Sequence, residues 1–94
     1  MSAIIEFKLP DKLTIERVSR LHEELEPLSS QKDADQIHLD AEAVLKTDAA
    51  GMQLLAVFTH DALAHNIKTC LLRPSDDFCH ASKILGLNGV LGIS

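Results

Sequence analysis

Aromatic residues are scarce in this chain, which has three phenylalanines and neither tryptophan nor tyrosine. A core must therefore be built mainly from leucine, isoleucine, valine and alanine, and the hydrophobic fraction of 46% allows one. No apolar run reaches the roughly 18 residues that a membrane-spanning helix needs. The first residues, MSAIIEFKLP, lack the basic start and the cleavage site of a signal peptide. We therefore expect a cytoplasmic protein with no direct membrane insertion.

Cysteine and positive charge are also in short supply. The two cysteines, Cys70 and Cys79, have no CxxC spacing, and in the cytoplasm they should stay reduced as small buried hydrophobes. The formal net charge is −5, and the acidic excess falls entirely within residues 1–48. Because no basic stripe is present, nucleic acid is not an expected partner. Other proteins are the expected partners.

The sequence offers no arrangement of residues that predicts catalysis or metal binding. His60 and His65 are five residues apart, so they do not share a helical face as a zinc pair would. Neither a GxSxG nucleophile motif nor a glycine-rich phosphate loop occurs. Asp76 and Asp77 are typical of the acidic first turn of a helix rather than of paired acid–base catalysis. We expect no enzyme, no cofactor and no metal site.

Strand and helix periods alternate along the chain. Strands are predicted at residues 3–9, 37–41, 66–72 and 90–93, and helices at 14–27, 48–65 and from Ser75 to a stop at Gly86. The first helix should bury a stripe made of Ile15, Val18, Leu21, Leu25 and Leu28. Such alternation predicts a single α/β domain over residues 1–94, with a small, mostly parallel four-stranded sheet and about three helices.

The stretch KTDAAG, residues 46–51, is unusual because a helix starts in it almost without side chains. Asp48 suits the N-cap of the second helix, where its carboxylate can accept hydrogen bonds from first-turn amides. Gly51 costs roughly 1 kcal/mol against alanine inside a helix. A glycine there indicates close approach, either of a neighbouring backbone or of a partner's surface. Cap and packing alone, or an exposed docking site at the end of a strand, remain two open explanations.

Residues 39–94 resemble the STAS domains, a family named for sulfate transporters and anti-sigma-factor antagonists. In that family a strand leads into Asp-Ser-x-Gly at a helix start, and a long apolar helix, a strand, a helix and an LGL element follow. Asp48, Ala50 and Gly51 match the first, third and fourth places of the motif. The order of elements extends the resemblance over nearly the whole chain and implies the STAS fold.

Two features depart from the family pattern. Regulated members carry a phosphorylatable serine directly after the aspartate, whereas this chain has Ala49, which has no hydroxyl. Thr47 is adjacent but precedes the cap, so phosphorylation there is not favoured. Many members also begin with an extra strand beside the one predicted at residues 3–9, and a minimal four-stranded version is expected here.

The resemblance implies a non-catalytic protein-interaction module of bacterial signalling that lacks the switch serine. Its partner would be an anti-sigma factor or kinase-like protein, or a chemotaxis or two-component protein. The main alternative is the cytoplasmic subunit of a lipid-transporting ABC system, and a more remote one is a nucleotide or small-ligand binder. The expected partner-binding residues surround the start of the second helix: Lys46, Thr47, Asp48, Ala49, Ala50, Gly51 and Gln53.

Overall fold

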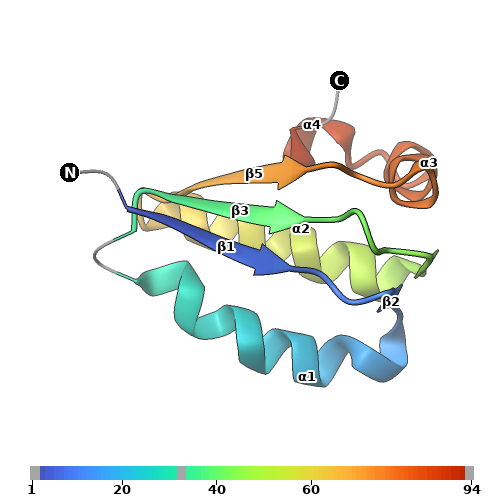
Figure 1. Cartoon of the computed structure of the whole chain (residues 1–94), viewed down its shortest axis with the longest axis horizontal. Coiled ribbons are helices and arrows are strands. Elements are labelled where there is room, and N and C mark those ends of the chain that lie inside the picture. The colour runs from blue at the N-terminus through green and yellow to red at the C-terminus, as the bar shows by residue number, and fades with distance from the viewer. Residues whose placement is uncertain (1–2, 32–33, 93–94) are drawn as a thin grey trace.

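Strands and helices alternate in the computed structural model, which describes residues 3–31 and 34–92. Figure 1 shows their arrangement, and the elements in chain order are β1 (Ile4–Lys8), β2 (Lys12–Leu13), α1 (Ile15–Leu25), the 3₁₀ helix η1 (Glu26–Ser30), β3 (Gln36–Asp40), β4 (Lys46–Thr47), α2 (Ala49–Ala64), β5 (Lys68–Leu72), α3 (Asp76–Ile84) and α4 (Asn88–Leu91). The predicted α/β class and its main alternation are confirmed.

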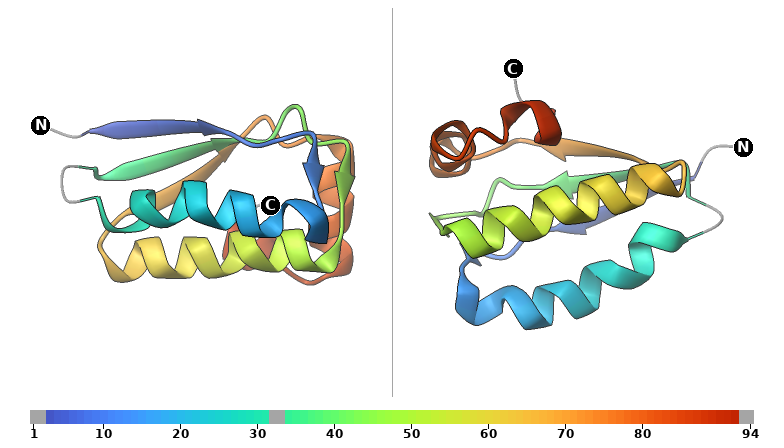
Figure 2. Two further views of the ribbon diagram at one scale, coloured as in Figure 1. Left: turned by 90° about the horizontal axis from the view of Figure 1, so that it is seen from below. Right: turned by 180° about the vertical axis from the view of Figure 1, so that it is seen from behind.

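The main sheet has three parallel strands in the order β1-β3-β5. Both α1 and α2 lie on one of its faces, below the strands in the left view of Figure 2. Because side chains alternate along a strand, Ile37 and Leu39 of β3 point to the helices and are fully buried. The other residues of β3, such as His38, are only half-buried.

The core forms where α2 packs under the sheet and beside α1. The buried residues of α2 include Met52, Leu55 and Phe58, which recur at helical spacing. Helix α1 contributes Leu21 and Leu25 and ends just before Pro27, since proline cannot continue the hydrogen-bonding pattern of a helix. The chain then makes the 3₁₀ turn η1, which the sequence did not predict.

A second, two-stranded ladder lies beyond the carboxyl ends of β1 and β3. In it Lys12 and Leu13 of β2 pair in parallel with Lys46 and Thr47 of β4. Neither segment was among the predicted strands. Helix α1 begins next to this ladder, past the tip of β1 (Figure 1), so Ile15 is 68% exposed instead of lying on the buried stripe.

The strand predicted at residues 90–93 is wrong over the described part of the segment. Residues 88–91 form helix α4, and Ile93 lies outside the described residues. Leu87 and Leu91, one helical turn apart, are both buried, and Gly92 ends the helix with a φ of 71°. Within residues 3–31 and 34–92 the main sheet therefore has three strands in place of four, and α4 brings the number of α-helices to four.

The two cysteines are also less buried than predicted. Cys70 and Cys79 are free thiols, and both are half-buried. Cys70 lies on the face of β5 that continues the row of His38 across the sheet.

Candidate functional site

Asp48 joins the starts of two helices. One carboxylate oxygen, Oδ1, accepts a hydrogen bond from the backbone N–H of Gly51 in the first turn of α2, at 2.9 Å. The other, Oδ2, accepts from the backbone N–H of Ile15, the first residue of α1, at 2.8 Å. The bond from Gly51, followed by the bond from Ile15, holds the pKa of the Asp48 carboxyl below its ordinary value.

The first of these bonds confirms the predicted N-cap, whereas the second was not foreseen. Thr14 does occupy the N-cap position of α1, but its side chain makes no capping bond. Its hydroxyl donates instead to the carboxylate of Glu16 at 3.4 Å. The capping acceptor for α1 therefore comes from Asp48, 33 residues further along the chain.

Position 51 accommodates only glycine, because another part of the chain's own backbone passes next to it. A Cβ atom at this position would overlap the carbonyl oxygen of Leu13 and lie 2.5 Å from its carbonyl carbon. That same carbonyl oxygen accepts a hydrogen bond from Asp48 N–H at 3.0 Å. Of the two kinds of close approach left open by the sequence, the structure shows the backbone one, and Gly51 is buried.

Ser75 fastens the start of α3 to the segment that leads into β4. Its hydroxyl donates to the carbonyl oxygen of Val44 at 2.7 Å and accepts from the N–H of Phe78 at 3.1 Å. This second bond is the N-cap that the sequence predicted for the third helix. The bond from Ser75 to Val44 thus holds the start of α3 at a fixed distance from the segment that leads into β4.

Between these elements runs an open groove of about 410 Å³, which we call the α2–α3 groove. Its lining residues are Leu45, Lys46, Thr47, Asp48 and Ala49 on one side and Asp77, His80, Ala81, Ile84 and Leu85 of α3 and its end on the other. Leu45 is 66% exposed and Ile84 is 69% exposed. The groove therefore has apolar side chains on both walls that no other part of the described chain covers.

The groove brings together four of the seven predicted partner-binding residues, Lys46 to Ala49. Ala50, which is half-buried, and Gly51, which is buried, do not line it. Gln53 is exposed on α2 but lies outside the groove.

The α3 wall was missed as part of the site. Phe78 and Ser82 of α3 are buried. Asp77, Ala81 and Ile84 follow one another at intervals of four and three residues, which places them on one adjacent face. The isoleucine at position 84, on the same helical face as Asp77, was the signal available in the sequence.

Arg73 fixes the turn between β5 and α3 to the end of β3. Its guanidinium contacts the carboxylates of Asp40 at 2.7 Å and Glu42 at 3.1 Å. The hydrogen bond from Arg73, together with one from the backbone of Glu42, lowers the pKa of Asp40. This cluster supports the position of α3 without entering the groove.

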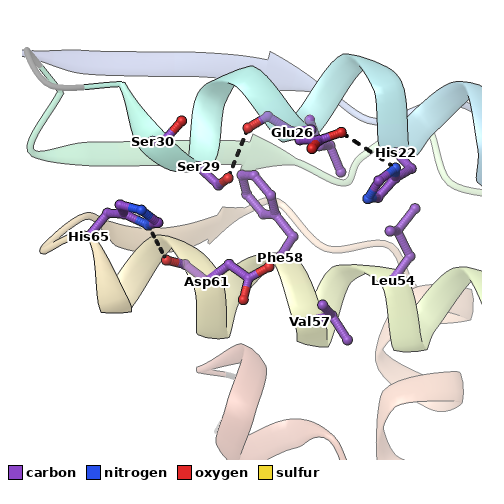
Figure 3. Close-up of a pocket in the computed structure, with 10 residues that line it drawn as sticks. His22, Glu26, Ser29, Ser30, Leu54, Val57, Phe58, Asp61 and His65 are labelled. Atoms are coloured by element: carbon purple, nitrogen blue, oxygen red, sulfur yellow. Dashed lines mark hydrogen bonds and ion pairs between the residues drawn. The ribbon is translucent and has the colours of Figure 1, made fainter.

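A second hollow, of about 270 Å³, lies between α1 and η1 on one side and α2 on the other (Figure 3). Apolar side chains such as Phe58 line it together with two histidines. Nδ1 of His65 lies 2.9 Å from the carbonyl oxygen of Asp61, and Nδ1 of His22 lies 3.9 Å from a carboxylate oxygen of Glu26. Each histidine thus interacts with a group one helical turn away.

The described residues, 3–31 and 34–92, form neither a cluster of metal ligands nor a membrane-spanning helix. No group of three or more histidine, cysteine, aspartate or glutamate side chains is placed so that it could hold a metal ion. None of the helices in these ranges has the length and apolar character needed to cross a membrane.

Solved structures with a similar arrangement of elements include two kinds of bacterial protein. A sulfate transporter family protein from Wolinella succinogenes superposes with a TM-score of 0.80 at 19% identity, over 98% of this chain and 75% of that one. The Bacillus anti-sigma factor antagonist SpoIIAA superposes in its unphosphorylated form with a TM-score of 0.76 at 19% identity, over 95% and 77% of the two chains. The phosphorylated form of SpoIIAA superposes with a TM-score of 0.71 at 19% identity, over 95% of this chain and 80% of that one. At this identity the likeness establishes the fold.

The family follows from the sequence as a whole. No curated protein matches the chain. The model of the STAS domain, however, matches residues 2–94, and these include the Asp48 cap, Gly51 and both walls of the groove. This chain belongs to the STAS domain family.

Proposed function

We propose that this chain is a non-catalytic interaction module of bacterial signalling that binds a protein partner in the α2–α3 groove and at the adjoining start of α2. STAS domains are in general non-catalytic modules that bind proteins such as kinases or transporters. The observation that carries the proposal is the exposure of Leu45 and Ile84 on facing walls of one groove, with Ala49 at its edge.

The apolar walls favour a protein surface as the occupant. Scattered exposed apolar residues are ordinary in a folded protein, but two that line one groove, as Leu45 and Ile84 do, favour an interaction site there. Lys46, Asp77 and His80 line the same groove, so polar groups surround the apolar contacts. An apolar centre with a polar rim is the usual composition of a protein interface.

The groove is also held in shape before any partner arrives. One wall is fixed by the β2–β4 ladder and by both bonds of the Asp48 carboxylate. The other is fixed through Ser75 to the carbonyl of Val44. A preformed surface loses less conformational entropy on binding, which increases affinity.

The proposed module lacks a serine-operated switch. Ala49 is exposed at the first position of α2, where a phosphate would otherwise meet the helix N-terminus, and it has no hydroxyl to modify. Thr47 lines the groove but belongs to β4, where its backbone pairs with Leu13. Binding through this surface is therefore constitutive in the proposal.

The proposal predicts that Ala49→Glu abolishes partner capture while the protein stays folded. A negative charge is favourable at a helix N-terminus, and residue 49 is exposed, so the domain tolerates the change. The larger, charged side chain should nevertheless obstruct the groove. Tagged protein is used to capture partners from the native cell extract, with quantitative mass spectrometry as the readout and circular dichroism as the test of folding.

Two further variants make the result specific. Ile84→Ser removes an exposed apolar contact from the opposite wall and should weaken capture of the same partner roughly tenfold or more, as expected for loss of a central apolar contact. His60→Glu adds a negative charge at an exposed position of α2 outside the groove and should leave capture unchanged. A folded Ala49→Glu protein that retains every partner at full strength would show that the docking site lies elsewhere.

The captured partner also decides the biological setting. A sigma-factor regulator, a chemotaxis protein or a two-component kinase would support the signalling role, which the proposal places in the cytoplasm. A permease or ATPase subunit of a lipid-transporting ABC system would instead support the transport role. The likeness to a sulfate transporter family protein keeps this second role in the test.

A further inference from the structure

Strand β1 forms one border of the sheet, and half of its backbone polar groups have no strand beside them within the described residues. The carbonyl oxygen of Ala3 accepts from Gln36 N–H, and Leu9 N–H donates to the carbonyl of Asp40, so these residues face β3. In a parallel pair the direction of the backbone groups alternates. The N–H and C=O groups of Ile4, Glu6 and Lys8 therefore point outward from the sheet.

The side chains of β1 also suit a further strand at this border. On the outer face Glu6 and Lys8 are exposed and opposite in charge. On the helix face Ile5 and Phe7 are only half-buried, although they pack against the core. An added strand would cover both apolar residues and would meet one acidic and one basic side chain.

We propose that β1 pairs antiparallel with β1 of a second copy of this chain, with Phe7 on the two-fold axis. Glu6 of each copy then lies opposite Lys8 of the other. The two sheets become one continuous sheet with both sets of helices on the same side. The left view of Figure 2 shows β1 along the near border of the sheet, where the second strand would lie.

Charge selects this register among the symmetric alternatives. Facing residues in an antiparallel pair point to the same side of the sheet. The two-fold axis must therefore lie at a residue that faces its own copy. An axis at Glu6 would place two glutamates opposite each other, which is unfavourable, and an axis at Ile5 would place Glu6 opposite Ile4. Only the axis at Phe7 forms two pairs of opposite charge.

The same register satisfies the outward backbone groups. Glu6 and Lys8 face each other as a hydrogen-bonded pair and exchange both of their N–H···O=C bonds across the border. Phe7 meets its own copy in a non-hydrogen-bonded position, where side chains come closest, and Ile5 meets Leu9. Pairing stops at Pro10, which has no N–H to donate.

The opposite border of the sheet is a poorer site for such a contact. Helix α4 lies beside β5 there, as Figure 1 shows and as the contacts between the two elements require. Pairing through one short strand buries a small area. The proposed dimer should therefore be weak and reversible, as is typical of interfaces smaller than about 1,200 Å².

A charge-exchange experiment tests the proposal without disturbing the fold, because both side chains are exposed. Analytical ultracentrifugation of the whole chain, at protein concentrations from about 10 µM to about 1 mM, should show a monomer–dimer equilibrium, because weak interfaces associate in this range. Either E6K or K8E alone should raise the dissociation constant roughly tenfold or more, because all facing pairs become like-charged. A mixture of the two single variants should associate again, since every facing pair in the mixed dimer is oppositely charged.

Cross-linking checks the register independently. In a C70S/C79S background, Phe7→Cys should form a disulfide-linked dimer, because facing Cα atoms in a non-hydrogen-bonded pair are about 4.5 Å apart, a distance that a disulfide spans. Ile5→Cys is the matched control, since its two copies would be about 14 Å apart. A chain that stays monomeric to about 1 mM, a range that includes weak interfaces, overturns the proposal. So does a mixture of E6K and K8E that associates no better than either alone.

Discussion

Replacing Gly51 with alanine is expected to destabilise the protein by about 3 kcal/mol or more, at the upper end of the range for overpacked interiors. The added Cβ would overlap the carbonyl group of Leu13, which is backbone and cannot move aside by rotating a side chain. The same carbonyl accepts a hydrogen bond from Asp48, so a shift of β2 would also break this link. Because small domains are stable by only roughly 5–15 kcal/mol, this loss removes a large share of the free energy of unfolding.

Urea denaturation followed by circular dichroism measures the effect, and Gly89→Ala is the matched control. A Cβ at Gly89 would meet no atom within 4 Å, and the position lies in helix α4. Alanine is the better helix former there, by about 1 kcal/mol, so the control should be neutral or slightly stabilising. Equal stability of Gly51→Ala and the unmodified protein would contradict this prediction. It would mean that β2 moves away from α2 with no loss in the free energy of unfolding.

The strong periodic patterns in the sequence predicted most of the fold. Alternation in β1 and β3 and the helical spacing of Leu21 and Leu25 in α1 reflect one buried face each, and such patterns can be read without knowing the neighbours. The β2–β4 ladder was not predictable in this way. Each of its strands has two residues, and they pair because β1, β3 and the helices bring them together.

The segment at the end of the chain shows where a short apolar run is ambiguous. Four residues such as 90–93 are too few to distinguish a strand from a helical turn by their period. Burial of Leu87 and Leu91 decided for the helix, and that burial depends on the packing of α4 against α2 and α3.

In the candidate site, too, the local interactions were predicted from the sequence and the contacts between distant segments were not. Asp48 was identified as the cap of its own helix, because capping acts over three residues. Its bond to Ile15 depends on the approach of two segments 33 residues apart, which no local pattern encodes. Gly51 was correctly marked as a point of close approach, but the identity of Leu13 as the neighbour required the structure.

Replacing Asp48 should destabilise the protein in two steps that separate its two capping roles. Asp48→Asn retains an oxygen that can accept from Gly51 N–H, but its amide nitrogen is a donor and cannot accept from Ile15 N–H. Asp48→Ala removes both acceptors. The thermal midpoint should therefore fall for the asparagine variant and fall further, by several degrees in all, for the alanine variant. Thr14→Ala, at an N-cap whose side chain makes no capping bond, should change little.

The contribution of Asp48 should also depend on pH in a defined direction. Its pKa in the folded protein lies below the ordinary value of 3.8, because the hydrogen bonds from Gly51 and Ile15 favour the carboxylate. The stabilisation is therefore fully present above pH 3.8 and is lost as the pH falls through the folded-state pKa. Asp40 is stabilised in the same sense by Arg73, so the pH profile of one protein alone cannot separate the two carboxylates. The difference in midpoint between the unmodified protein and Asp48→Asn isolates Asp48, and it should shrink as the pH is lowered below that value. A difference that stays constant across this range would show that the ionised carboxylate does not hold the two helix starts together.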